Sequence, residues 1–314
     1  MTKPMRDAIA RSGYLMEQRL VPVVESFGFM ATPNERFRDA ETGELRELDI
    51  GAISGFRIRA RGYQFVFPVL LIACKNLSCP IVFFTQQVER SDFFLGPVPV
   101  SGLPLQVRRR GKPNQDLVYF LRLEKFHHYY RTGRLASQFC AVYEAKKQDR
   151  QKGSPPVFEA GHTIGGRIEL YRDFHSLAQA VVAYKRDHGR SFRLDRNDEE
   201  VNLQFYYPIF VTSGPLVECF VGRRTPRYRP VHRIGFLLRT RVGSEQREFR
   251  IDVVDEAGVK RLLRVINHEM SQVSDRIRQH RLVIKQSLNW ITKKLARRKP
   301  KFRRSYVSGE AETD

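Results

Sequence analysis

Two short strings bring together residue types that could hydrolyse a phosphodiester bond. They are Glu47-Leu48-Asp49-Ile50 and Leu71-Ile72-Ala73-Cys74-Lys75-Asn76, and both follow a segment that contains Glu17 and Glu25. Paired carboxylates can hold a Mg²⁺ ion, which polarises a phosphoryl oxygen and acidifies a bound water. A neighbouring lysine can stabilise the negative charge that develops during the reaction. This chemistry requires that the chain bring the acids and the lysine to one place.

The elements around these strings are typical of an α/β domain. Apolar residues recur at roughly helical spacing from Met5 to Phe27, and Gly28 stands where such a helix would stop. Residues 46–54 alternate between polar and apolar, as a strand does. The nearly continuous apolar run at residues 64–74 predicts a strand that is buried on both faces. A helix followed by strands of increasing burial favours an α/β fold.

With these residues in this order, the sequence resembles the PD-(D/E)xK nucleases, also called the restriction-endonuclease-like superfamily. The resemblance covers about residues 13–87. It implies a mixed sheet flanked by helices, with Asp49 as the first acid and Lys75 as the lysine of the motif. Glu17 matches the helical glutamate that some members use, so Asp49 and Glu17 are the implied Mg²⁺ ligands and, with Lys75, the implied catalytic residues.

The sequence departs from this pattern at the second acid, where Ala73 cannot ligate a metal. One interpretation is that catalysis has been lost and the fold is kept for binding, so that no cofactor is needed. A second is that Glu17, Glu25 or Glu47 has taken over the missing role in an active, Mg²⁺-dependent endonuclease. A third is that the similarity arose by chance. Whether the protein is an enzyme therefore stays open at this point.

The charge of the chain points to a polyanionic partner. Lys and Arg number 55 against 34 Asp and Glu, which gives a net charge of +21 and a pI of about 10.2. We expect the partner to be nucleic acid, DNA rather than RNA, and not a membrane. The side chains expected to contact it are Arg108, Arg109, Arg110, Lys112, Arg223, Arg224, Arg227, Tyr228, Lys293, Lys294, Arg297 and Arg298.

The C-terminal part has a different pattern. Apolar residues from Leu263 to Leu295 step by three and four, and residues 276–306 contain twelve lysines and arginines and no acid. We expect an α/β domain over residues 1–255, one long amphipathic basic helix over 256–299, and a disordered tail over 300–314. The apolar seam at 257–297 also fits a coiled coil, so a homo-oligomer, a partner protein or an assembly scaffold is an alternative function.

Other site classes lack their signatures. The apolar run at 65–74 is too short to span a bilayer, and the first twenty residues lack the apolar core of a secretory signal. The four cysteines have no CxxC spacing, so we expect reduced thiols and a cytoplasmic location. His127 and His128 have only Glu124 at ligand spacing, so we expect no metal site there.

Overall fold

The computed structural model of the chain describes thirteen ranges of residues. These are 1–11, 13–39, 41–58, 65–88, 97–109, 111–131, 133–144, 158–161, 163–164, 168–191, 201–222, 225–243 and 245–298. The predicted disordered tail at 300–314 lies outside them, as do Arg110, Arg223 and Arg224. No helix in the described part of the chain is long and apolar enough to cross a membrane.

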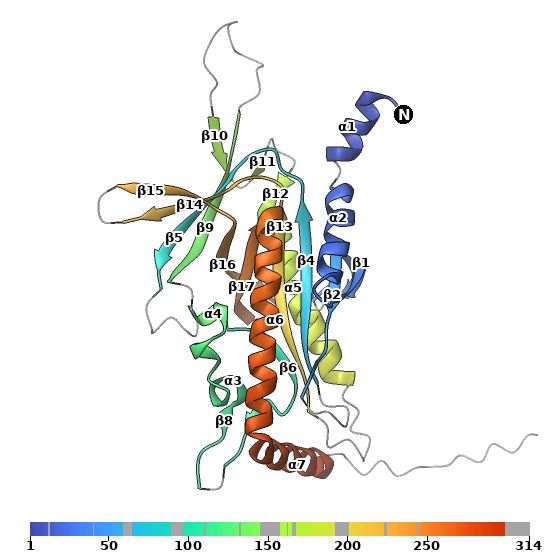
Figure 1. Ribbon diagram of the computed structural model, residues 1–314, viewed down its shortest axis with the longest axis vertical. Helices are drawn as coiled ribbons and strands as arrows, with labels where there is room; N and C mark the ends of the chain where they lie inside the picture. The colour runs from blue at the N-terminus through green and yellow to red at the C-terminus, as the bar shows by residue number, and fades with distance from the viewer. Residues whose placement is uncertain are drawn as a thin grey trace, which may run out of the picture.

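The fold is built on a 13-stranded mixed sheet, with strands β1-β2-β4-β13-β17-β16-β9-β5-β14-β15 in spatial order (Figure 1). These strands are β1 Met30–Arg38, β2 Leu45–Ile53, β4 Phe65–Lys75, β13 Asn202–Thr212, β17 Glu245–Asp255, β16 Arg233–Val242, β9 Arg134–Glu144, β5 Ile81–Gln87, β14 Leu216–Val221 and β15 Pro226–Val231. Short strands β3 Phe56–Arg57, β6 Val100–Leu103 and β10 Phe158–Gly161 pair with β4, β13 and β9. Two small separate sheets are formed by β7 Gln106–Val107 with β8 Gln115–Asp116, and by β11 Thr163–Ile164 with β12 Ile168–Glu169.

Helices cover both faces of the sheet. The longer ones are α1 Lys3–Arg11, α2 Tyr14–Glu25, α5 Leu170–Ser191, α6 Glu256–Gln279 and α7 Arg281–Arg298. The short turns α3 Leu117–Phe120, η2 Leu123–Lys125 and α4 His128–Arg131 lie beside α6 (Figure 1). Side chains of α2 and α6 belong to one core cluster, and side chains of α5 belong to the other. The expected mixed α/β sheet flanked by helices is therefore confirmed.

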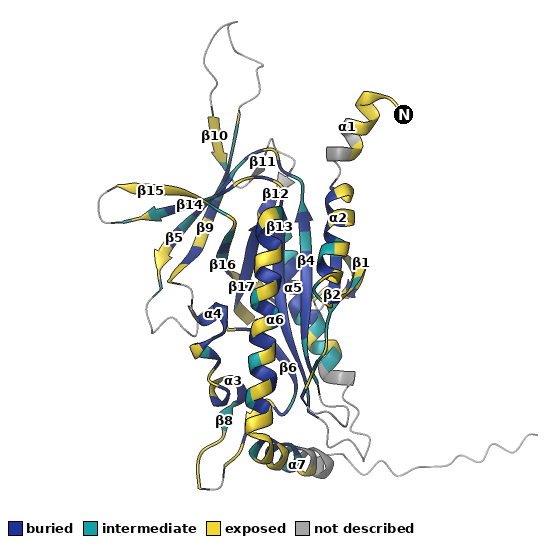
Figure 2. Ribbon diagram, viewed as in Figure 1, coloured by how far each residue is buried: buried dark blue, intermediate teal, exposed yellow. Residues whose placement is uncertain are grey.

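Strand β4 is buried on both faces, as its apolar run predicts. Val66, Leu70 and Ile72 belong to the core on the α2 and α6 face, and Val69 and Leu71 belong to the core on the α5 face. This alternation follows from the twofold side-chain period of a strand. Neighbouring β13 runs parallel to β4 along its whole length. Figure 2 shows that both strands are largely buried, which it draws in dark blue.

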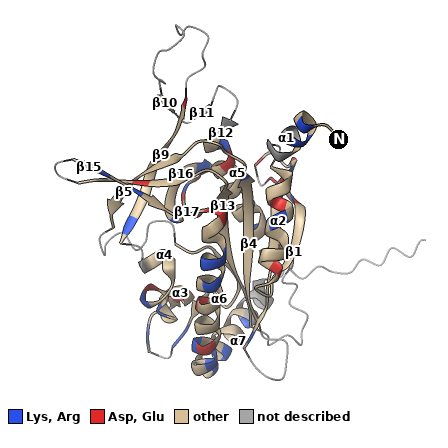
Figure 3. Cartoon of the chain, turned by 45° about the horizontal axis from the view of Figure 1, so that its top comes forward, with Lys and Arg blue, Asp and Glu red and all other residues tan. Residues whose placement is uncertain are grey.

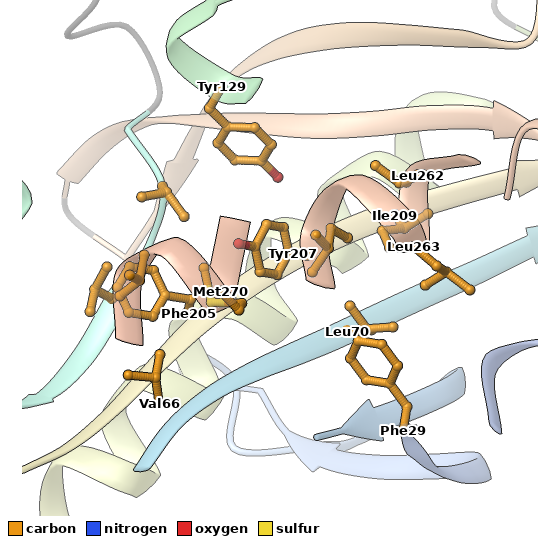
Figure 4. Packing of buried hydrophobic residues seen from close by; sticks show 14 of the residues in the cluster. Phe29, Val66, Leu70, Tyr129, Phe205, Tyr207, Ile209, Leu262, Leu263 and Met270 are labelled. Carbon is orange, nitrogen blue, oxygen red and sulfur yellow. The ribbon is translucent and has the colours of Figure 1, made fainter. Parts of the chain in front are cut away.

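The C-terminal helix differs from the prediction. It breaks at His280, which ends α6 and separates it from α7. The apolar seam also has a partner within the chain. Figure 4 shows Leu263 and Met270 of α6 lying among side chains of β4 and β13, including Leu70 and Tyr207. The first half of the seam is therefore core, so this half does not offer the exposed apolar stripe that a coiled coil needs.

Candidate functional site

Asp49 lies where the pairing of β2 with β4 ends. The ladder runs antiparallel up to the pair Ile50–Ile72, and beyond it the Asp49 carboxylate accepts a hydrogen bond from the backbone N–H of Cys74 at 2.5 Å. The side chain thus takes the place of a backbone acceptor between the two strands. Burial raises the pKa of Asp49, against the lowering effects of the Cys74 N–H and of Lys75. Asp49 and Lys75 are therefore on adjacent strands at one end of the sheet.

Lys75 is the last residue of β4, and its ammonium is held by Asp173. The Lys75 Nζ lies 3.0 Å from Asp173 Oδ1 and 2.9 Å from Oδ2. Asp173 comes from the first turn of α5, 98 residues further along the chain. Ala73, on the same side of β4, packs partly buried against the α5 face. An acid therefore stands beside the lysine, although it comes from a helix that sequence reasoning did not connect to the site.

Glu17 adds a third carboxylate from the first turn of α2, where its side chain is mostly buried. Burial raises the pKa of Glu17, and the charges of Asp49 and Glu47 raise it further. Glu47 also raises the pKa of Asp49, so these acids lie close enough to repel one another. Glu25 is exposed at the other end of α2, about 12 Å along the helix from Glu17. The structure thus brings Glu17, Glu47 and Asp173 towards Asp49 but leaves Glu25 away from it.

The arrangement does not supply a three-ligand metal site. In the described residues, no three ligand atoms from these acids lie within 4.8 Å of one another. Asp49 already accepts the Cys74 N–H, and Asp173 is paired with Lys75. Mg²⁺ needs near-octahedral oxygen coordination and is often held through one or two carboxylates. The Asp49 cluster, defined as Glu17, Glu47, Asp49, Lys75 and Asp173, therefore offers no converging set of three protein ligands, and two of its acids are already engaged by the Cys74 N–H and by Lys75.

A group of exposed cations forms where two distant segments meet. Strand β7 leads into the loop that carries Arg108, and this loop lies on α7: the Arg108 N–H donates to Ser287 Oγ at 2.9 Å. The Arg108 guanidinium sits 5.0 Å from the ring centre of Trp290. We call this surface the basic end. Its exposed described cations are Arg108, Arg109, Lys112, Arg281, Lys285 and Lys293.

The basic end lies far from the Asp49 cluster. Helix α6 begins beside that cluster, where Glu256 pairs with Arg19 of α2 at 3.0 Å, and it ends where α7 starts. Its 24 residues give a length of about 36 Å. Figure 3 shows lysines and arginines along α6, which connects the two regions. The side chains of Lys294, Arg297 and Arg298, at the end of α7, lie outside the described part.

Arg227 and Tyr228 are separate from the basic end. Both are exposed on β15, the last strand in the sheet order, and Figures 1 and 3 show the β14–β15 hairpin away from α7. The predicted nucleic-acid contacts are thus divided between two regions of the surface.

A buried histidine cluster was not expected. Ligand atoms of His127, His128 and Glu269 lie within 4.8 Å of one another. His128 contacts Glu269 through Nδ1 at 2.7 Å and Asp252 through Nε2 at 3.0 Å. The nearby carboxylates raise the pKa of His128 against the effects of burial and Arg233, whereas burial lowers that of His127. Both ring nitrogens of His128 thus lie within hydrogen-bond distance of a carboxylate, an arrangement that favours the protonated form of the ring.

The geometry of this cluster does not favour a metal ion. The two imidazole rings are stacked, with centroids 4.9 Å apart and planes only 16° from parallel. A nitrogen lone pair lies in the plane of its ring, so one ion cannot lie in both planes. The His127 Nδ1 also accepts the Tyr129 N–H at 3.2 Å. In the sequence, Glu269 and Asp252 lie more than a hundred residues from His128, so no local pattern indicates that these residues form a network.

Comparison with family models, with curated proteins and with solved structures found no match to this chain.

Proposed function

We propose that this chain is a nucleic-acid-binding protein, acting on duplex DNA, whose restriction-endonuclease-like core no longer hydrolyses phosphodiester bonds. The single observation that carries the proposal is the basic end. There, segments nearly 180 residues apart place their exposed cations on one surface through the contacts of Arg108 with Ser287 and Trp290. A surface of this kind neutralises phosphates and gains affinity from the release of counterions.

The order of elements supports a core of nuclease descent. Helix α2 precedes an antiparallel meander of β1, β2 and β4, and α5 leads into β13, which runs parallel to β4. Asp49 and Lys75 stand on adjacent strands with α2 beside them, as the resemblance implies. This agreement concerns the positions of the residues rather than their activity.

Three features argue against hydrolysis at the Asp49 cluster. Position 73 offers a methyl group where the motif needs a carboxylate. The Lys75 charge is compensated by Asp173, so it attracts a phosphate less strongly. Burial and neighbouring acids favour protonation of Asp49 and Glu17, which weakens both as ligands. Together these features support binding without cleavage.

One observation favours the competing candidate, an active metal-dependent nuclease. Asp173 stands beside Lys75 and acts electrostatically on Asp49, as a relocated second acid would. In that case, movement of the Lys75 side chain would free Asp173 to bind a metal together with Asp49.

Incubation of the full chain with supercoiled plasmid in Mg²⁺ or Mn²⁺ distinguishes the two candidates. We expect the protein to retard the plasmid on a gel and to leave it supercoiled. Nicking that is abolished by both Asp49→Ala and Asp173→Ala, but is retained in Glu25→Ala, would establish the active nuclease and overturn the proposed loss of hydrolysis. Absence of any retardation would overturn the binding role itself.

A further inference from the structure

Helix α6 carries its exposed side chains on a single face. Exposed positions recur every three or four residues, and they include Lys260, Arg264, His268, Asp275 and Arg278. Residues at this spacing lie one above the other on a helix. The opposite face is buried in the core, and Figure 2 shows exposed positions along the whole length of α6. The exposed face is thus a straight strip of surface about 36 Å long.

Three cations stand together near the N-terminal end of this face. They are Lys260, Arg261 and Arg264, which we call the basic row, and all three are exposed. None of them forms an ion pair with an acid in the part of the chain that the structure describes. Glu256, one turn before the row, is paired with Arg19 at 3.0 Å. The charge of the basic row is therefore available to a ligand outside the protein.

No unpaired exposed acid lies on α6 between the basic row and the basic end, a stretch that the structure describes completely. The exposed acid there is Asp275, and its carboxylate is paired with Arg278 at 3.2 Å. The basic end then begins at Arg281, the first residue of α7. Along the helix axis, about 31 Å separate Lys260 from Arg281. Two groups of cations thus stand at the two ends of one straight face.

This separation is close to the pitch of duplex DNA. One turn of the B-form helix is about 34–36 Å long, so a strand that faces the protein at one point faces it again about that distance further on. Cations at the two ends of α6 can therefore contact phosphates one helical turn apart. The middle of the face, with Ser271 and the paired Asp275, then lies over the grooves between these phosphates. A flexible single strand has no such repeat.

We propose that one DNA duplex lies along the exposed face of α6 and contacts the basic row and the basic end one helical turn apart. The proposal rests on the DNA-binding role of the basic end, and it adds Lys260, Arg261 and Arg264 as a second set of phosphate contacts. It also sets the shortest duplex that engages both sets. At about 3.4 Å per base pair, a distance of about 31 Å corresponds to about nine base pairs.

The test measures the affinity of the full chain for two labelled, blunt-ended duplexes by fluorescence anisotropy at several salt concentrations. A duplex of about 7 base pairs is about 24 Å long and reaches only one of the two sets of cations at a time. A duplex of about 20 base pairs reaches both. The test variant replaces the basic row by glutamine: Lys260→Gln, Arg261→Gln, Arg264→Gln. The control variant removes as many exposed cations from β16 and β17: Arg239→Gln, Arg241→Gln, Arg247→Gln.

With the longer duplex, the test variant should bind about tenfold or more weakly than the wild type. The slope of log K against log salt should be shallower by about 2 to 3, because three phosphates keep their counterions. With the shorter duplex, the loss of affinity should be smaller, since the basic end can still hold it. The control variant should bind both duplexes as the wild type does.

Wild-type affinity and slope of the test variant for the longer duplex would overturn the proposal, although the basic end would remain a binding surface. An equal loss with both duplexes would also overturn it, because the two sets of cations would then not share one duplex. If the wild type binds neither duplex, the DNA-binding role itself fails.

A second variant covers the case in which the triple variant does not fold. The Arg264 guanidinium lies 5.9 Å from the ring centre of Phe27, so its loss removes a contact within the protein. The Lys260→Gln, Arg261→Gln double variant keeps this contact. Its slope with the longer duplex should be shallower than that of the wild type by about 1 to 2, and an unchanged slope would overturn the proposal.

Discussion

Asp49, Glu17 and Glu47 carry like charges within reach of one another, and burial raises the pKa of both Asp49 and Glu17. Repulsion among these acids is relieved only in part by the Cys74 N–H and by Lys75. A cluster of this kind opposes folding when its acids are ionised. The repulsion within the Asp49 cluster should therefore be visible in how the stability of the protein changes with pH.

Glu17→Gln should raise the free energy of unfolding at pH 7. The folded-state pKa of Glu17 lies above its ordinary value of 4.5, so the native protein binds more protons than the unfolded chain between those two values. The stability of the wild type consequently falls as the pH rises through that window. The advantage of Glu17→Gln should be largest at pH 7 and shrink towards pH 4, as measured by urea unfolding at several pH values.

The control for this experiment is Glu25→Gln, on the exposed face of the same helix. A stability gain in Glu17→Gln that is equal at pH 4 and pH 7 would mean that charge repulsion does not act on Glu17.

Sequence reasoning located Asp49, Lys75 and Glu17 because each lies in a short segment with a clear strand or helix pattern. It could not find Asp173, since this partner of Lys75 is 98 residues away in the sequence. The His128 network was missed for the same reason, because burial and distant acids determine its chemistry.

At the scale of elements, α7 is the part that connects the proposed binding surface to the core. Ile284 and Leu288 on one side of α7 are buried, while its Lys285 and Lys293 are exposed. Trp290, the only tryptophan of the chain, lies under Arg108 within this surface. Its fluorescence thus reports on the basic end alone.

Binding of duplex DNA should change the fluorescence intensity or emission maximum of Trp290. A phosphate that draws Arg108 away alters the charge next to the indole ring. The Arg108→Gln variant should show a different spectrum before DNA is added and a smaller change afterwards. The DNA must be saturating, as judged independently by gel retardation. A saturated complex with an unchanged Trp290 spectrum would place the DNA elsewhere on the protein.

Helix α6 offers a test between a core helix and a coiled coil. Ile266 is fully buried against the sheet, so Ile266→Ala should lower the free energy of unfolding by about 2–4 kcal/mol. The unfolding midpoint should not depend on protein concentration, because the contacts lie within one chain. A midpoint that rises with concentration in the wild type, and loses that dependence in Ile266→Ala, would instead indicate association through the seam.

Local pattern predicted some elements well and others badly. The continuous apolar run at 64–74 gave strand β4, because burial on both faces requires it. Leu135 and Phe139 have a spacing of four that fits a helix, but residues 135–144 lie in strand β9, between β5 and β16. Pairing with distant strands overrode the local spacing there. No proline or glycine lies next to His280, so the sequence does not indicate the break between α6 and α7.

For the whole molecule, the sequence predicted the mixed α/β class of the fold but not the order of the strands in its sheet. The central strands β4, β13 and β17 come from three distant parts of the chain, so their order depends on long-range packing. The curl that brings the end of β15 next to the start of β16 is equally non-local. The net charge of +21 could be read directly, but its division between the basic end and the sheet edge required the structure.

The salt dependence of duplex DNA binding tests whether the basic end holds the DNA. The slope of log K against log salt counts the phosphates that the protein neutralises, at about 0.9 per phosphate. The wild type is compared with two triple glutamine variants of exposed cations. The test variant replaces Arg109, Lys112 and Lys293 in the basic end, and the control replaces Arg239, Arg241 and Arg247 on the sheet.

If DNA binds at the basic end, the test variant should bind more weakly, and its slope should be shallower by about 2 to 3. The control should keep the wild-type slope, because its three arginines lie outside the proposed surface. Equal slopes for the wild type and the test variant would contradict the account, as would a loss of slope in the control alone.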